Sequence, residues 1–271
     1  MSLIFKEKGH LYESIDPNEK INWTSVTSVI SKFKGSFNAE LQASKSTKNK
    51  KSKWYKIPPK KILEIWNNES NRAMTLGTFY HNQRESDLTG LDTLTIEGQA
   101  LPVIPPKIID GLKYAPNQKL IPGIYPEHFV YLKSASICGQ ADYVEVVDNK
   151  INIIDYKTNK EIRKNSYKNW EGISKMLNGP VSHIEDCNLM HYNLQLSLYM
   201  YMMIKHNPKL KPGKLILQHV IFEKKGMDEY GYPITKYQDN GDPIVKEVVS
   251  YELPYLKAEV LSIIKYLKNN G

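Results

Sequence analysis

The sequence predicts an α/β fold, because stretches typical of strands and stretches typical of helices follow one another along one chain. Three successive runs rich in β-branched and aromatic residues, 127–133, 137–147 and 150–157, indicate strands. Residues 187–206 carry the spacing of a helix, and Leu215–Phe222 is a further apolar strand candidate. The length of 271 residues is enough to bury one full core. We therefore expect a single domain over residues 1–271.

The N-terminal third is expected to hold a strand pair and two helices. Residues 3–13 suggest two short strands, and Thr24 or Ser25 can cap a helix that runs through Phe33. After Pro58-Pro59 a second helix should begin near Lys60 and run toward His81. We expect this helix to be interrupted near Asn67-Asn68.

Prolines and polar residues predict where regular structure is sparse. Pro102, Pro105 and Pro106 indicate that residues 89–126 are mostly loop. Residues 226–247 hold glycines and prolines between polar strands, which is typical of a projecting hairpin. Apolar residues at helical spacing over 255–268 predict a last amphipathic helix.

A basic arm is expected at residues 37–61. Lys45–Lys61 contains eight lysines and no acidic residue, together with Trp54 and Tyr55. One interpretation is a solvated surface, and the other is a DNA-guiding arm whose lysines contact phosphates while the aromatic rings stack on unpaired bases. The net charge of +8 favours a polyanionic partner.

The strongest chemical signal is a pair of carboxylates on one predicted hairpin. If Asp148-Asn149 is a two-residue turn, Val147 pairs with Lys150, and counting back places Asp142 opposite Asp155. Asp155 and Lys157 point to the same face, because strand side chains alternate. Carboxylates this close repel each other unless a proton, a cation or the lysine intervenes. Hard oxygen ligands of this kind suit Mg²⁺ or Mn²⁺.

These residues resemble the active-site signature of the PD-(D/E)XK nuclease superfamily. Gly77-Thr-Phe-Tyr-His81 is similar to the G-x-x-x-H element of its RecB-like branch, and Gln195-Leu-Ser-Leu-Tyr199 is similar to the Q-x-x-x-Y helix. His10-Leu-Tyr12, with the Val-Thr-Ser-Val that begins at Val26, resembles small stand-alone phage exonucleases and the mitochondrial genome maintenance exonuclease. The resemblance covers roughly residues 1–225. Ala141 stands where the superfamily's name has proline.

The resemblance implies a restriction-endonuclease-like central mixed sheet flanked by helices, with a metal site at one sheet end. It implies that His81, Asp142, Asp155 and the Tyr156 carbonyl hold Mg²⁺ or Mn²⁺. In relatives the lysine that matches Lys157 orients or deprotonates the attacking water. For Lys157 the residues themselves also allow a simpler role, which is to neutralise the aspartates.

Four further residues are candidates for the site, each with a second interpretation. Glu85 is one helical turn beyond His81 and can hold the imidazole in place. Glu127 opens a predicted strand, where it either supports the metal indirectly or forms a surface ion pair. Gln195 and Tyr199 contact a DNA phosphate or order the site, or they form a hydrogen bond within the core.

The expected function is a metal-dependent DNA exonuclease that acts on single-stranded or end-containing DNA. A structure-specific or restriction-like endonuclease and a catalytically silent nucleic-acid-binding module are the alternatives. The two polar extensions are expected to fence a channel over the metal site. Cys138 and Cys187 are too few for an iron–sulfur cluster, and no apolar run is long enough for a membrane span. We expect the protein to act in the cytoplasm of a bacterium or of a phage-infected host. Its protein partners are unknown.

Overall fold

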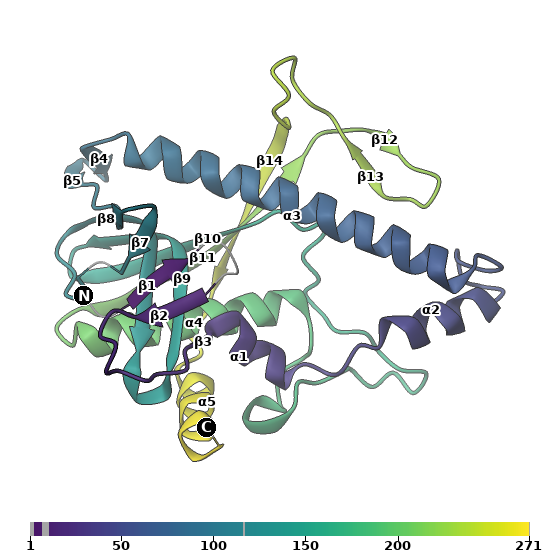
Figure 1. Cartoon of the computed structure of the whole chain (residues 1–271), viewed down its shortest axis with the longest axis horizontal. Coiled ribbons are helices and arrows are strands. Elements are labelled where there is room, and N and C mark those ends of the chain that lie inside the picture. Colours follow the sequence, from purple (N-terminus) through teal and green to yellow (C-terminus); the bar gives the residue numbers. More distant parts are fainter. Residues whose placement is uncertain (1–2, 7–10, 116, 271) are drawn as a thin grey trace.

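The computed structural model describes residues 3–6, 11–115 and 117–270, and a mixed β-sheet forms its centre (Figure 1). The strands of this sheet are β3 (Thr24–Ser25), β8 (Gly123–Leu132), β9 (Ile137–Val147), β10 (Lys150–Lys157), β11 (Lys211–Phe222) and β14 (Val245–Leu253). Their order is β14–β11–β10–β9–β3, and β8 also pairs with β9. Two neighbouring pairs, β10–β11 and β3–β9, are parallel, and the others are antiparallel.

Helices cover both faces of this sheet, which confirms the predicted fold class. The helices are α1 (Val26–Phe33), α2 (Ala39–Lys48), α3 (Pro59–Thr89), α4 (Asn188–His206) and α5 (Lys257–Asn270), with short 3₁₀ turns at Lys133–Ala135 and Gly179–Val181. One face of the sheet packs against α1, α4 and α5 in the largest core cluster. The other face packs against Leu76 and Tyr80 of α3 (Figure 1). Among the described residues, no helix is long and apolar enough to cross a membrane.

A local sequence signal accounts for the start of α1, whereas burial accounts for the continuity of α3. Ser25 is the N-cap of α1, and its side chain accepts a hydrogen bond from the Ser28 amide, as predicted. The predicted interruption of α3 is wrong, because the helix is continuous through Asn67 and Asn68. Both asparagines are exposed, so each costs only a fraction of 1 kcal/mol in helix propensity, roughly 0.7 kcal/mol at most. Buried residues before and after them hold α3 together.

The prediction that residues 89–126 are mostly loop is only partly right, because it missed the short strands of this segment. The segment contains two tight hairpins, β4 (Thr93–Ile96) with β5 (Gln99–Pro102) and β6 (Lys107–Ile109) with β7 (Leu112–Tyr114), and β8 already begins at Gly123. The hairpins turn at Glu97-Gly98 and Asp110-Gly111, where all four residues have positive φ. Such two-residue turns match the twist of antiparallel strands, so the Asp-Gly pair was a hairpin signal in the sequence. β7 also pairs with β1 (Leu3–Lys6), which pairs with β2 (Leu11–Ser14) as predicted.

The two polar extensions pack against each other at the N-terminal half of α3. Residues 226–247 contribute the short hairpin of β12 (Lys224–Met227) and β13 (Pro233–Thr235), and residues 37–61 contribute α2 and the turns after it. Trp54 from the arm stacks on Tyr230 from the hairpin, with ring centroids 5.7 Å apart. The Lys53 ammonium lies 4.4 Å and 4.5 Å from the Trp54 and Tyr232 ring centroids and donates to the Tyr230 carbonyl at 2.6 Å.

Gly213 is a position where the sheet tolerates no side chain. A Cβ atom on Gly213 would meet the Asn152 side chain and lie 2.8 Å from the Ile151 carbonyl oxygen. At this point the β10–β11 register shifts between Ile151 and Ile153, and the Asn152 side-chain oxygen accepts the Lys214 amide at 2.7 Å. The bulge therefore uses the space that a larger residue would need.

We expect Gly213→Ala to lower the free energy of unfolding by about 1–3 kcal/mol, because a methyl group must displace the Asn152 side chain and shift the backbone. Urea denaturation measures the change. Gly226→Ala in β12 is the matched control, because nothing lies within 4 Å of a Cβ there. Equal stability of the two variants would contradict this account of the bulge.

Candidate metal centre

The hairpin of β9 and β10 brings two aspartates together, as the sequence predicted. The turn is Asp148-Asn149, with φ of 50° and 57°, and Val147 pairs with Lys150. Pairing continues to Tyr143 opposite Ile154, so one further step brings Asp142 opposite Asp155. At that step the Asp142 carboxylate, in place of a backbone carbonyl, accepts the Tyr156 amide at 2.6 Å. The Asp142 side chain thus lies where β9 and β10 separate.

Asp155 and Lys157 form a buried ion pair on the same face of β10. The Asp155 side chain is 1 % exposed, and its Oδ1 accepts a hydrogen bond from Gln195 Nε2 at 3.2 Å. Burial raises the pKa of Asp155 to about 6, although the nearby Lys157 ammonium acts to lower it. Burial alone would lower the pKa of Lys157, but Asp155 and Asp142 raise it above its usual value. Without a metal ion, Lys157 is therefore an ammonium that neutralises the aspartates.

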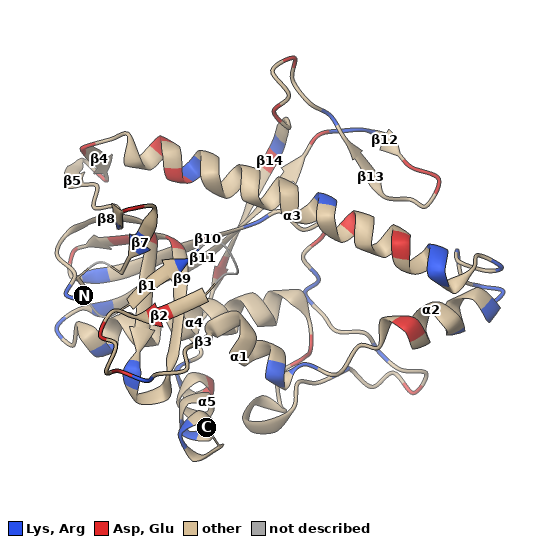
Figure 2. Ribbon diagram, viewed as in Figure 1, with Lys and Arg blue, Asp and Glu red and all other residues tan. Residues whose placement is uncertain are grey.

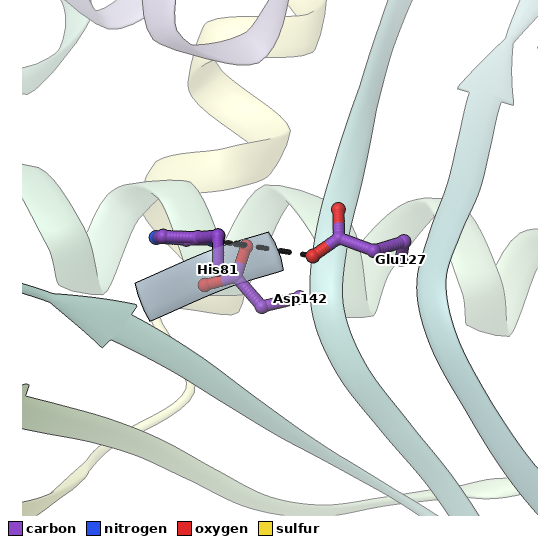
Figure 3. A group of neighbouring side chains, drawn as sticks. All are labelled: His81, Glu127 and Asp142. Carbon is purple, nitrogen blue, oxygen red and sulfur yellow. Dashed lines mark ion pairs between the residues drawn. The ribbon is translucent and has the colours of Figure 1, made fainter. Parts of the chain in front are cut away.

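His81 lies on α3, and its imidazole reaches the Asp142 carboxylate on β9. Gly77, one turn earlier, allows the close approach of α3, because a Cβ atom there would lie 3.3 Å from Thr158 Oγ1. His81 Nδ1 is 3.4 Å from Asp142 Oδ1 and 4.0 Å from Glu127 Oε1 (Figure 3). Burial alone would lower the pKa of His81, but Asp142 and Glu127 raise it to about 9. At neutral pH the imidazole of the metal-free protein is therefore protonated.

Glu127 lies inside β8, not at its beginning, and is held in an unusual backbone conformation. Its φ is 48°, although its neighbours Pro126 and His128 pair regularly with Tyr143 and Ala141 of β9. Left-handed conformations of residues other than glycine are strained and cluster at functional sites. Glu127 is 9 % exposed and points toward His81 and Asp142 (Figure 3), so it is not a surface ion pair.

The His81, Glu127 and Asp142 side chains form a group that could hold a metal ion. Their ligand atoms all lie within 4.8 Å of one another. Two carboxylates and one imidazole suit a divalent ion such as Mn²⁺ or Mg²⁺, which prefer oxygen ligands. The predicted ligands Asp155 and Tyr156 are placed differently here. Asp155 is held by Lys157 and Gln195, and the Tyr156 carbonyl lies 3.4 Å from the Lys157 ammonium.

Gln195 and Tyr199 order the site from α4. Gln195 Nε2 donates to Asp155 at 3.2 Å and also to the Tyr199 hydroxyl at 3.3 Å. Gly139 of β9 makes room for the phenol ring, because a Cβ atom there would be 2.5 Å from Tyr199 Cε1. Both side chains also line a cavity that contains Asp142, so ordering the site and facing a ligand are compatible roles.

Glu85 and the basic arm differ from expectation. In the part of the chain that the structure describes, Glu85 does not orient the His81 imidazole. Its side chain turns toward β7, where its carboxylate accepts a hydrogen bond from the Lys113 ammonium at 2.9 Å. In the arm, Trp54 is buried against the hairpin and so is not available for base stacking, and Lys61 pairs with Glu64 at 3.1 Å. The exposed lysines that remain gather around the end of α2 and the start of α3 (Figure 2): Lys45, Lys48, Lys50, Lys51, Lys56 and Lys60.

Two cavities open on the metal group, one of about 590 Å³ and one of about 230 Å³. They share His81, Glu127 and Gln140 as lining residues. Neither cavity is lined by described residues of the arm or of the 226–247 hairpin. These two cavities lie among residues of α1, α3, β1, β2 and β7, and the expected channel between the two extensions stays a prediction.

No protein-family model matches the chain, and no curated protein matches it by sequence.

The Glu127 carboxyl should make stability fall as pH rises. Its pKa is raised well above the usual value, chiefly by burial and by Asp142. The folded state then holds the proton more tightly than the unfolded chain, so stability present below the unfolded pKa, about 4.3, is lost at higher pH. We expect Glu127→Gln to remove this loss, so that the metal-free variant is more stable than wild type at pH 8 and about equally stable at pH 4.5.

Urea denaturation with EDTA at both pH values measures the effect. Glu252→Gln on β14, an exposed position, is the control and should change stability little at either pH. A Glu127→Gln variant that is less stable than wild type at pH 8 would show that the carboxylate is ionised and well paired in the fold.

Proposed function

We propose that this protein is a divalent-metal-dependent deoxyribonuclease that acts as an exonuclease. One observation carries the proposal: the partly buried His81 and the buried Glu127 and Asp142 lie directly beside the ion pair of the buried Asp155 with Lys157. Clusters of carboxylates with raised and lowered pKa values are typical of catalytic sites and costly elsewhere. The resemblance of these residues to the RecB-like PD-(D/E)XK signature supports the same reaction. The fold class agrees with it.

The residues of the site divide into two roles. Asp142, Glu127 and His81 would hold the ion, once His81 has given up its proton. When bound, Mg²⁺ or Mn²⁺ supplies positive charge to the phosphate and acidifies a water. Lys157 would steady negative charge that develops on the phosphate, because its ammonium is already held beside Asp155 and the Tyr156 carbonyl. Gln195 keeps Asp155 oriented.

DNA is the proposed substrate. The net charge of +8 and the exposed lysines at the end of α2 favour a polyanion, whose phosphates they can contact without reading its sequence. Lys53 is not counted among these contacts, since its ammonium is held between Trp54 and Tyr232.

Removing either member of the buried ion pair should stop cleavage. We expect Lys157→Met and Asp155→Asn to reduce the rate by a factor of about 10² or more, because the first removes the positive charge that acts at the reacting phosphate and the second removes the carboxylate that holds this charge in place. Digestion of end-labelled oligonucleotides with Mg²⁺, with Mn²⁺ and with EDTA measures this, and EDTA should abolish the wild-type reaction. Lys214→Met, at an exposed lysine of β11, is the control.

Thermal unfolding of each variant must accompany the assay, because Lys157→Met leaves a buried carboxylate without its cation. A folded Lys157→Met variant that cuts at the wild-type rate would exclude the proposed role of Lys157. Binding of DNA without cleavage by the wild-type protein under all metal conditions would favour a catalytically silent binding module.

Cleavage should require a free DNA end. We expect linear single-stranded DNA to be shortened to small products with Mg²⁺, while a covalently closed circle of equal nucleotide concentration persists. The comparison uses gel electrophoresis over one time course. Equal rates on both substrates would favour the endonuclease alternative.

A further inference from the structure

The smaller of the two cavities beside the metal group has an unusual wall. Apart from His81, Glu127 and Asp142, the side chains that line this space of about 230 Å³ carry neutral hydrogen-bonding groups. They are the hydroxyls of Tyr12, Ser25, Thr27 and Tyr199 and the amides of Gln140 and Gln195. A water occupies about 30 Å³, so the cavity has room for a group larger than several waters.

The larger cavity, which shares His81 and Glu127 with the smaller one, has a different wall. Its lining includes Phe5 and Met74, together with the Glu85–Lys113 ion pair. Apolar side chains suit a base or a sugar, whereas a wall of hydroxyls suits an oxygen-rich group. The metal group thus borders both a partly apolar space and a space lined by hydroxyls.

Two hydroxyls of the smaller cavity are available to a ligand. Thr27 is exposed on the first turn of α1, and its hydroxyl lies 3.0 Å from that of Ser25. Because Ser25 donates its own proton to the Ser28 hydroxyl at 2.8 Å, Thr27 donates to Ser25, and a ligand oxygen at this exposed position can take the place of Ser25 as acceptor. Ser25, not Thr27, accepts the Ser28 amide that caps α1, so the helix does not need the Thr27 hydroxyl. Tyr199 accepts a hydrogen bond from Gln195, which leaves its own proton to donate.

We propose that this cavity holds a phosphate of the substrate strand, next to the phosphate that is cut, with the Thr27 and Tyr199 hydroxyls donating to its non-bridging oxygens. The inference rests on the proposed nuclease function and specifies how the site positions its substrate. Neutral donors are suited to this position, because a lysine or arginine there would repel the metal ion and pair with its carboxylate ligands. The partly apolar cavity, which also borders the metal group, then receives a nucleoside of the same strand.

The test asks whether the Thr27 hydroxyl and one oxygen of a single DNA phosphate act as a pair. Thr27→Val removes the hydroxyl with little change in shape, and Ser31→Ala removes an exposed hydroxyl one turn further along α1, outside the cavity, as the control. Each protein is given single-stranded oligonucleotides that are unmodified or carry one methylphosphonate linkage, placed in turn at each of the first four linkages from either end.

On unmodified DNA we expect Thr27→Val to lower kcat/KM about tenfold, as for loss of a hydrogen bond to a charged group, and Ser31→Ala to act like wild type. At one linkage position the methylphosphonate should slow wild type and Ser31→Ala but leave Thr27→Val almost unaffected, because the hydroxyl and the oxygen act as a pair. If Thr27→Val cuts unmodified DNA at the wild-type rate, or if the methylphosphonate slows every protein equally at every position, the inference is overturned while the nuclease stands.

Binding of the same oligonucleotides, measured by fluorescence anisotropy with Ca²⁺, separates the two proposals. If wild type cuts no DNA but binds it, with a loss of affinity in Thr27→Val that depends on the same linkage, the phosphate pocket stands and the nuclease proposal falls. If wild type neither cuts nor binds DNA, both are overturned.

Discussion

The burial of three carboxylates beside two cations is the constraint on which this structure depends. Glu127, Asp142 and Asp155 lie together where β9 and β10 separate, and His81 and Lys157 face them. Burial alone would raise the pKa of Asp142, but His81, Lys157 and the Tyr156 amide keep it below its usual value. Ionised carboxylates in a largely buried site are tolerated only when cations and hydrogen bonds offset the loss of water contacts.

That constraint explains why distant elements converge at one point. The two cations come from α3 and β10, and the orienting amide of Gln195 comes from α4 on the opposite face of the sheet. Two glycines lie at close contacts around the site: Gly77 of α3 near Thr158, and Gly139 of β9, which makes room for the Tyr199 ring. Glu127 adds a strained residue to the same place. A metal-free protein must hold this arrangement with protons and ion pairs, which are weaker substitutes for a divalent ion.

The extensions have a structural part that is separate from the metal centre. Trp54 and Tyr230 join the arm to the hairpin, and Lys53 lies between aromatic rings from both. Lys160, three residues after Lys157, donates to the Gly231 carbonyl at 3.0 Å and so links the end of the β10 strand segment to the hairpin. These contacts hold the arm in place against α3, so its exposed lysines belong to a packed segment of the structure.

The sequence by itself determined those features that depend on neighbours along the chain. The Asp148-Asn149 turn sets the hairpin register, and a period of two puts Asp155 and Lys157 on one face, so the acidic pair was predictable to the residue. Helices α1, α4 and α5 were likewise predictable from a cap residue and from apolar spacing. The short hairpins in 89–126 were missed because the prolines outweighed the Asp110-Gly111 turn signal.

Only the tertiary structure decided which side chains meet across elements. Nothing local predicts that Glu127 turns inward at a positive φ, that Glu85 turns away to Lys113, or that Trp54 is covered by the hairpin. The physical reason is that these contacts join residues far apart in sequence, whose approach is set by how α3 and the small sheet pack on the central sheet. Packing of this kind is a property of the whole core, whereas turn chemistry and side-chain periodicity are properties of a few consecutive residues.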